Sequence, residues 1–357
     1  MSKLDDILDT LAHRQPEFVP LMEDFGDDNA EQHFLPPMPS DPLERRFAEA
    51  EFLGNWMIGA GGGGLQSERI EEGPDSYLLR WENGARWRIH LRPQWWREYC
   101  DLPVQQEGDL QRMPLPDPDN PARYAGVAER VRAIEARGYL PTGGIMGFFS
   151  GVWYFCRPFE TFLEDLVLRP GFARVLVDRI GAFNLAAAQH LLECGVRVIG
   201  FADDLGHNRG TFFSPSVYRE FFLPWHRRLA DLCHAHGAYV NMHSHGNINA
   251  IVGDLCDAGI DILNPVGPSD GMDLAQLKRR YGHRMTLMGG VSKFIGEMSR
   301  SELREHLEQV FRVGAAGGGF IAYSEGSIPI NMTRENLAYY LQLRRELSAR
   351  YGRRGPG

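Results

Sequence analysis

The sequence predicts an α/β fold built on a parallel sheet, a (β/α)8 TIM barrel with an irregular N-terminal extension that contains a β-hairpin. From about Gly138 onward, short apolar runs alternate with longer segments of helical period, a pattern typical of βα units. Glycines stand where a helix is expected to end and a strand to begin, as at Gly195 and Gly237. The 357 residues, 43% of them hydrophobic, are enough to bury one large core.

Six strands are expected in the regular part of the chain, because six short apolar runs follow one another between helical segments. They are expected at Leu140 to Phe149, Val196 to Asp203, Ala238 to His245, Ile260 to Asn264, Met285 to Met288 and Gly319 to Ser324. We therefore divide the chain into residues 1–138, which hold the extension and the first barrel elements, and residues 139–357, which form the main part of the barrel.

Helices are expected between and after these strands. Two of them have clear start signals: Ser214 with Pro215 matches an N-cap followed by a first-turn proline, and Ser299 with Glu302 has capping-box spacing. The helices are expected at Phe159 to Leu168, Gly171 to Cys194, Ser214 to His236, Ile248 to Ala258, Leu274 to Tyr281, Arg300 to Ala315 and Thr333 to Arg350.

The first 138 residues are less regular and are expected to supply the remaining barrel strands and a cover over one mouth. A hairpin is expected to pair Ser76 to Trp81 with Ala85 to His90 across Asn83-Gly84, a dipeptide that favours a type I′ turn. The glycine run from Gly59 to Gly64 lacks the Lys-Ser/Thr of a P-loop and the spacing of a dinucleotide motif. It therefore favours a flexible loop or lid over a phosphate site.

Composition excludes several classes of partner. A net charge of -9 argues against nucleic acid, because proteins that bind a phosphate backbone usually carry a basic field. The first residues are polar and acidic rather than basic and then apolar, and the apolar stretches are far shorter than the roughly 20 residues that span a bilayer. Five cysteines without CxxC spacing fit a reducing compartment. We expect a soluble, cytoplasmic protein that binds neither membrane nor nucleic acid.

The densest group of chemically active residues follows the strand expected at residues 238–245. Since side chains alternate along a strand, Asn241, His243 and His245 share one face, and strand ends carry the chemistry in barrel folds. Two imidazoles at this spacing could bind one metal ion, with zinc favoured by nitrogen ligands. The alternative is that the two histidines make separate hydrogen bonds to substrate or neighbours. Asn241 is a candidate substrate contact.

A second polar cluster follows the strand expected at residues 196–203. Asp203 and Asp204 are adjacent, so only one carboxylate can face inward, where it could act as general base, metal ligand or partner of an imidazole. The alternative is that one of them caps a loop or pairs with Arg209. His207 and Arg209 lie in the following loop and could contact an acidic group of a substrate, or could be solvated.

The last expected strand ends at Tyr323 and Ser324 and is followed by Glu325. Glu325 is the best candidate for a third, oxygen ligand at the same mouth, and a solvent-facing loop carboxylate is the alternative. Tyr323 is a candidate to line the pocket.

Taken together, these segments resemble the uroporphyrinogen decarboxylase superfamily, which includes methylcobamide-dependent methyltransferases. The resemblance runs over roughly residues 138–351 and implies a (β/α) barrel with its reaction centre at the C-terminal strand ends. It depends on the order and spacing of many short motifs, which include Ser214 to Phe221, His234 to Gly237, His243 to Ile248, Ala258 to Pro265, Gly271 to Asp273, Gly289-Gly290 and Gly317 to Phe320.

The decarboxylase branch carries an N-terminal Arg-Gln-Ala-Gly-Arg stretch that binds the propionates of its tetrapyrrole. This sequence lacks it, and the nearest pair, Arg45-Arg46, stands in an expected helix without the glycine. The resemblance therefore argues against uroporphyrinogen as the substrate.

The resemblance to the methyltransferase branch can be followed at that branch's zinc site. Its members carry a His-x-Cys-Gly motif and a second cysteine near the last strand, and both thiolates bind zinc. Here His243 matches the histidine, His245 takes the place of the first cysteine, and Glu325-Gly326 falls where the second would be. A site of two imidazoles and one carboxylate still suits zinc or another divalent metal, but it is harder and less electron-rich than a thiolate site.

Three hypotheses follow from the resemblance and the residues. The first is a metal-assisted methyltransferase. It moves a methyl group between a methyl carrier and an acceptor, and the carrier is either a corrinoid on a partner protein or a methylated small molecule. In it, His243, His245 and Glu325 bind zinc, and Asp203 or Asp204 orients or deprotonates. The second is a decarboxylase or lyase without metal, and the third is a non-catalytic corrinoid or small-molecule binding protein. Relatives often form dimers, so a homodimer is also an expectation.

Overall fold

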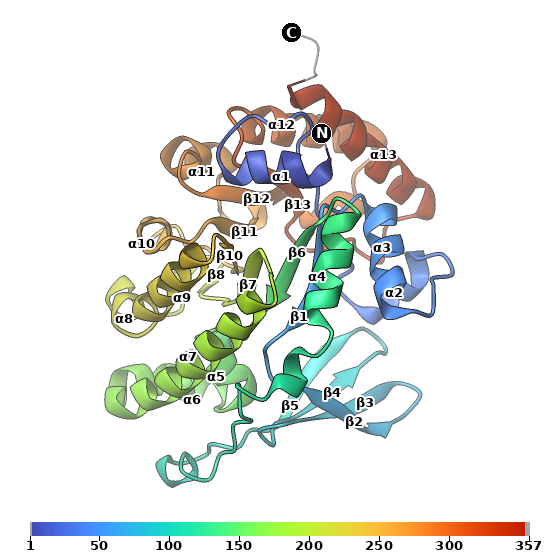
Figure 1. The fold of residues 1–357 in the computed structure, drawn as a ribbon. Helices are drawn as coiled ribbons and strands as arrows, with labels where there is room; N and C mark the ends of the chain where they lie inside the picture. The colour runs from blue at the N-terminus through green and yellow to red at the C-terminus, as the bar shows by residue number, and fades with distance from the viewer. Residues whose placement is uncertain (1, 354–357) are drawn as a thin grey trace.

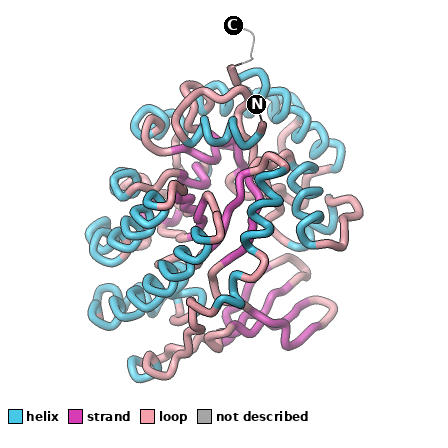
Figure 2. The backbone as a smooth tube through the Cα atoms, in the orientation of Figure 1, coloured by secondary structure: helices cyan, strands magenta, loops and turns pink. Residues whose placement is uncertain are grey.

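The computed structural model describes residues 2–353, and its centre is a curled sheet of seven parallel strands surrounded by helices (Figure 1). The strand order is β1-β6-β7-β10-β11-β12-β13. Figure 2 shows the same arrangement, with strands inside and helices outside. All neighbours in this sheet pair in the parallel sense. The carboxyl ends of these strands therefore meet at one mouth.

The strands of the central sheet are β1 (Met57–Gly62), β6 (Leu140–Gly144), β7 (Val198–Ala202), β10 (Tyr239–His243), β11 (Ile262–Val266), β12 (Thr286–Val291) and β13 (Phe320–Ser324). A separate antiparallel sheet contains β2 (Ser67–Glu72), β3 (Ser76–Trp81), β4 (Arg86–His90) and β5 (Trp96–Asp101), and a short hairpin contains β8 (Gly206–His207) and β9 (Gly210–Thr211).

The helices are α1 (Lys3–Leu11), α2 (Asp28–Phe34), α3 (Pro42–Leu53), α4 (Val127–Ala136), α5 (Ser150–Phe155), α6 (Phe159–Leu168), α7 (Pro170–Glu193), α8 (Pro215–Phe221), α9 (Leu223–Ala235), α10 (Val252–Ala258), α11 (Leu274–Tyr281), α12 (Arg300–Gly314) and α13 (Arg334–Tyr351). Four short 3-10 helices are η1 (Glu107–Asp109), η2 (Pro121–Tyr124), η3 (Pro268–Asp270) and η4 (Lys293–Gly296).

An extended segment around Leu21 lies beside β13 at one edge of the central sheet. On one side, Leu21 forms a parallel bridge with Ala322 of β13. On the other side, the backbone amide of Glu23 donates to the Asn55 side chain at 2.7 Å, just before β1 begins. The expectation of eight regular strands is therefore met in part, because the central sheet of the described residues has seven strands and the segment around Leu21 adds a single bridge. As expected, the residues that complete the sheet come from the first 138.

All six strands predicted in the regular part are confirmed, and several elements differ in extent. The first strand ends at Gly144 rather than Phe149, and the helix expected from Ile248 begins at Val252. The helix predicted over residues 214–236 is divided into α8 and α9 at Phe222. Pro224 explains the division, since proline has no N–H and its ring conflicts with the carbonyl four residues earlier. The N-cap at Ser214 and the capping box at Ser299 are confirmed.

The predicted hairpin is confirmed, but its turn is not type I′. β3 and β4 pair antiparallel, and the connection is residues 82–84, because the amide of Trp81 donates to the carbonyl of Ala85. Only Gly84 of the dipeptide has a positive φ, at 88°. The Asn83 side chain is buried instead and donates to the carbonyl of Phe155 at 2.7 Å. This tertiary bond anchors the antiparallel sheet to α5.

The glycine run is not a loop, as the sequence suggested, but the strand β1 and the residues directly after it. Its glycines let neighbouring helices approach closely. A Cβ added at Gly61 would lie 2.9 Å from Val127 of α4, and one at Gly63 would lie 2.6 Å from the Cβ of Ala187 of α7. The absence of side chains here therefore serves packing of the barrel wall, a requirement that the local sequence does not reveal.

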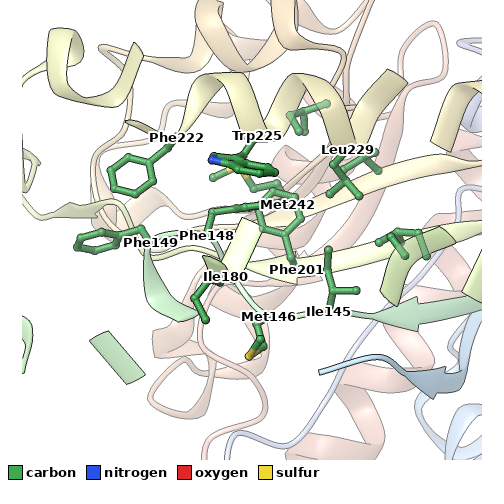
Figure 3. Packing of buried hydrophobic residues seen from close by; sticks show 14 of the residues in the cluster. Ile145, Met146, Phe148, Phe149, Ile180, Phe201, Phe222, Trp225, Leu229 and Met242 are labelled. Carbon is green, nitrogen blue, oxygen red and sulfur yellow. The ribbon is translucent and has the colours of Figure 1, made fainter. Parts of the chain in front are cut away.

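The main hydrophobic core fills the layer between the sheet and the outer helices. Figure 3 shows Phe148, Phe201 and Trp225 packed together between strands and α9. The ring centroids of Phe148 and Phe201 lie 5.4 Å apart, edge to face. A second core cluster contains buried residues of α1, α12 and α13 together with residues of β13.

Two expectations from composition can be compared with the structure. All five cysteines are free thiols, as expected for a chain without a disulfide framework. Among the described residues, the helices are too short or too polar to cross a bilayer.

The close packing around the glycine run predicts how a substitution there changes the free energy of unfolding. Gly63→Ala should destabilise the fold by about 1–3 kcal/mol, because the new methyl group meets Ala187. Gly171→Ala is the matched control: it lies in the first turn of α7 with nothing within 4 Å, so its stability should change by about 0.5 kcal/mol or less, or rise. Urea unfolding measures both. Equal stability of the two variants would show that residues 59–64 are not tightly packed.

Candidate active site

The candidate site lies at the carboxyl ends of β7, β10 and β11, where the sequence analysis placed its densest polar clusters. His243 is the last residue of β10, and His245 follows two residues later. Their ring centroids are 4.7 Å apart at an interplanar angle of 81°. The structure therefore brings the two predicted imidazoles into direct contact.

Each imidazole is oriented by a polar partner on its Nδ1 atom. The Nδ1–H of His243 donates to Oδ1 of Asn264, a buried residue of β11. Nδ1 of His245 lies 3.5 Å from a carboxylate oxygen of Asp270 in η3. With Nδ1 engaged in both rings, Nε2 is the nitrogen left to bind a metal ion, a proton or a substrate.

The two histidines differ in basicity. Burial, reinforced by the neighbouring His245, lowers the pKa of His243 below its usual value. The hydrogen bond to Asp270, followed by the nearby charge of Asp204, raises the pKa of His245. The same contact with His245 lowers the pKa of Asp270. At neutral pH the site therefore combines one neutral imidazole with one that holds a proton more strongly.

Asp204 is the carboxylate that reaches the two histidines. Its Oδ1 lies 3.9 Å from Nε2 of His243 and accepts the backbone N–H of His245 at 2.9 Å. Its own amide donates to the Ser150 hydroxyl at 3.1 Å. Asp204 is partly exposed to the mouth, so it can meet a bound molecule.

Asp203, by contrast, is fully buried and faces away from the mouth. Its carboxylate accepts three backbone amides, from Phe148 at 3.0 Å and from Phe149 and Ser150 at 2.8 Å each. Nε2 of His226 lies 3.2 Å from the same group. Of the two adjacent aspartates, Asp203 thus holds the loop before α5 in place, and Asp204 is the one whose carboxylate lies at the mouth beside the histidines.

Glu325 and Tyr323 make contacts within the fold. The carboxylate of Glu325 accepts the amide of Lys293 at 3.1 Å through Oε1 and the amide of Ser269 at 3.0 Å through Oε2. It thereby joins the loops that follow β11 and β12. The hydroxyl of Tyr323 donates to a carboxylate oxygen of Asp24 at 2.7 Å. Both side chains are buried.

The three candidate substrate contacts lie in different surroundings. Asn241 lies on β10 two residues before His243, on the same face of the strand. Its Oδ1 is buried and has no hydrogen-bond partner among the described residues. His207 and Arg209 are exposed on the β8–β9 hairpin. The hairpin approaches the mouth through Phe212, whose ring centroid is 5.6 Å from that of His207.

The arrangement for a metal ion is incomplete as it stands. Within residues 2–353, no group of three or more His, Cys, Asp or Glu side chains is positioned to hold a metal ion. Two imidazoles with oriented Nε2 atoms suit zinc, and a third ligand needs a side-chain movement toward them.

Sequence reasoning missed several residues of the site. Asn264 and Asp270 orient the two imidazoles, and both stand in the segment after Ala258 that the pattern marked only as strand and loop. A cavity of about 560 Å³ beside the site is lined by aromatic side chains, among them Tyr99, Trp153 and Phe212. These come from β5, α5 and the segment after β9, so no local motif could show that they converge.

The fold and the site together define an α/β-barrel protein with titratable groups gathered at the carboxyl ends of its strands. The chain belongs to the uroporphyrinogen decarboxylase (URO-D) family, whose model matches residues 99–347. This match confirms the resemblance seen in the sequence and places the chain in a family of enzymes.

Known relatives are similar at low identity. A uroporphyrinogen decarboxylase of Aeromonas salmonicida (strain A449) is 21% identical over 268 residues, which cover 70% of this chain and 71% of that protein. One of Histophilus somni (strain 129Pt) is 22% identical over 240 residues, 61% of this chain and 62% of that protein. The match thus spans less than two thirds of the second relative.

Among solved structures, a methyltransferase from Methanosarcina mazei superposes with a TM-score of 0.69. The alignment covers 97% of this chain and 99% of that chain at 17% sequence identity. At this identity the likeness shows the fold.

The different surroundings of the two aspartates give a prediction. Asp203→Asn should lower the free energy of unfolding by about 2–4 kcal/mol, because the buried carboxylate accepts three amides and faces His226. Asp204→Asn, the adjacent control, should cost less than about 1 kcal/mol because that side chain is partly exposed. Chemical denaturation compares the two. Similar losses in both variants would contradict the assignment of separate roles.

Proposed function

We propose that this chain is a metal-assisted methyltransferase of the URO-D family, with Nε2 of His243 and Nε2 of His245 as metal ligands. The observation that carries the proposal is the pair of Nδ1 partners, Asn264 and Asp270, which hold both rings with Nε2 unengaged. Such partners are typical of histidines that bind metal, since they fix the tautomer and the direction of the lone pair.

Asp204 is favoured over Glu325 as the third ligand. Its Oδ1 is already 3.9 Å from Nε2 of His243, and it is partly exposed. Both oxygens of Glu325 accept backbone amides, which a metal ion would have to replace. Zinc is the favoured metal because it accepts two nitrogens and one carboxylate and leaves a fourth position open.

Each part of the chain has its own task in this proposal. If zinc binds, His243, His245 and Asp204 would hold it, and it would supply Lewis acidity that lowers the pKa of a thiol, hydroxyl or water bound beside them. Asp204 would bind the metal with one oxygen and orient the molecule bound beside it with the other, and Asn264 and Asp270 keep the imidazoles aligned. The methyl group comes from a corrinoid carried by a partner protein or from a methylated small molecule. The aromatic cavity excludes water from the transfer.

Decarboxylation without metal is the second candidate, because the curated relatives at 21–22% identity bear the name uroporphyrinogen decarboxylase. The charge of the cavity argues against it. Its described lining contains no lysine or arginine to bind the carboxylates of a tetrapyrrole. Arg45 pairs with Glu31, and Arg46 donates to the carbonyl of Gly59. Release of carbon dioxide from uroporphyrinogen by chelator-treated protein would favour this second candidate.

Metal content tests the leading proposal. Protein purified from zinc-supplemented cells should contain about one divalent metal ion per chain, and His243→Ala and His245→Ala should each remove most of it, since two-ligand retention is weak. Inductively coupled plasma mass spectrometry on the folded variants provides the measurement.

The matched control is His207→Ala, which removes an exposed histidine from the nearby β8–β9 hairpin. This variant should keep its metal. Wild-type protein without metal, or full metal content in His243→Ala and His245→Ala, would overturn the proposal and leave the histidines as substrate contacts.

A further inference from the structure

The cavity beside the histidines has an unusual lining. It has a volume of about 560 Å³ and lies between the end of β7, the helices α5 and α6, and β5 of the antiparallel sheet. Four aromatic side chains line it, Tyr99, Trp153, Phe159 and Phe212. Asp204 and His245 of the candidate site line the same cavity. A molecule bound there would therefore touch the groups assigned to the chemistry.

The four aromatic rings stand at steep angles to one another. Trp153 and Phe159 have centroids 5.1 Å apart at an interplanar angle of 73°, and Phe159 and Phe212 are 5.0 Å apart at 81°. Tyr99 and Trp153 are 5.7 Å apart at 69°. Their faces consequently point in different directions and enclose a box rather than a flat slot. A compact, rounded group fits such a box better than a planar ring does.

Acidic residues outnumber basic ones in the lining of the cavity, where Asp204 and Glu160 stand beside the single imidazole of His245. Neither carboxylate forms an ion pair with a lysine or arginine in residues 2–353. Arg97 is not among the residues that line the cavity. It lies over the rings of Trp87 at 4.8 Å and Tyr154 at 5.3 Å and donates to the Tyr99 hydroxyl at 3.4 Å.

Aromatic faces and carboxylates attract the same kind of ligand. The ring quadrupole favours a cation over its face, and a box of such faces with a nearby carboxylate is a known way to bind methylated ammonium groups. From these observations we propose that the cavity binds a methylated cation, a small molecule with a quaternary ammonium head, as the methyl-bearing substrate.

This inference rests on the proposed methyl transfer and names its substrate class. In the transfer, the bond between nitrogen and one methyl carbon breaks, and nitrogen keeps the electron pair. The methyl group forms its new bond with the nucleophile of the acceptor, a thiolate or a cobalt(I) corrinoid. Asp204 lines the cavity, and its Oδ1 is the oxygen that lies 3.9 Å from Nε2 of His243. The other oxygen of this carboxylate, which does not bind the metal, attracts the positive head.

The experiment compares choline with its neutral isostere 3,3-dimethylbutan-1-ol, in which carbon replaces the charged nitrogen. Binding to the full, chelator-treated chain is measured by isothermal titration calorimetry. Choline should bind about 3- to 30-fold more tightly than the isostere, the range expected for a cation on aromatic faces. Equal or tighter binding of the isostere, or no binding of choline, would overturn the inference.

Two pairs of variants locate the effect. Asp204→Asn should reduce the preference for choline, whereas Asp273→Asn, an N-cap of α11 outside the cavity, should keep it. Phe159→Leu keeps an apolar side chain and removes a ring face, so it should weaken choline more than the isostere. Phe294→Leu, an exposed ring elsewhere, should change neither. An unchanged preference in Asp204→Asn and Phe159→Leu would also overturn the inference.

These measurements are independent of the metal assay, because they use protein without metal or corrinoid. A lost preference for choline, with metal still bound through the histidines, would refute only the substrate class. Retained preference for choline, with no metal in the wild type, would refute the metal-assisted mechanism and keep the ligand.

Discussion

The carboxylate of Asp203 is the interaction on which the candidate site depends. It is fully buried at the end of β7, accepts three consecutive backbone amides from the last two residues before α5 and the first residue of α5, and faces His226 of α9. The amide of the same residue donates to the carbonyl of His243 at 2.8 Å. One residue therefore connects the strand that carries Asp204, the strand that carries the histidines, and the loop that leads to the aromatic cavity. A buried charge that is satisfied in this way permits one arrangement of these three parts, because any other arrangement leaves the carboxylate or the amides without partners.

The chemistry at the mouth depends on the side-chain atoms that make no contact within the fold. Asn264 and Asp270 each take up one nitrogen of an imidazole, so the remaining nitrogens and Asp204 are the groups that can meet a ligand. The two histidines differ because their surroundings differ: burial lowers the pKa of His243, while the contact with Asp270 raises that of His245. Glu325 makes its contacts within the fold, since both of its oxygens accept amides from loops at the same mouth. The site is thus a small set of polar groups held by neighbours that do no chemistry themselves.

Much of the fold could be predicted from the sequence, because βα units have a strong local signal. The six strands after residue 138 and the start of α8 at Ser214 depend on apolar period and capping, which a single segment carries. The strand β1 was missed because its glycines are required by Val127 and Ala187, residues far away in the sequence. In the site, His243 and His245 were predicted from alternation at strand ends, together with one of Asp203 and Asp204, and the structure brings Asp204 to the two histidines. Asn264, Asp270 and the ring of Tyr99 could not be predicted, since their roles arise only when separate strands and helices meet.

The central claim is that Nε2 of His243 and Nε2 of His245 bind one metal ion at this mouth. The most direct measurement is a crystal structure of the zinc-loaded protein with anomalous diffraction data collected on both sides of the zinc absorption edge. The account predicts one anomalous peak about 2.0–2.1 Å from both Nε2 atoms, with Asn264 and Asp270 still on the Nδ1 atoms. A peak bound through Nδ1, a peak elsewhere, or no peak at the two histidines would contradict it.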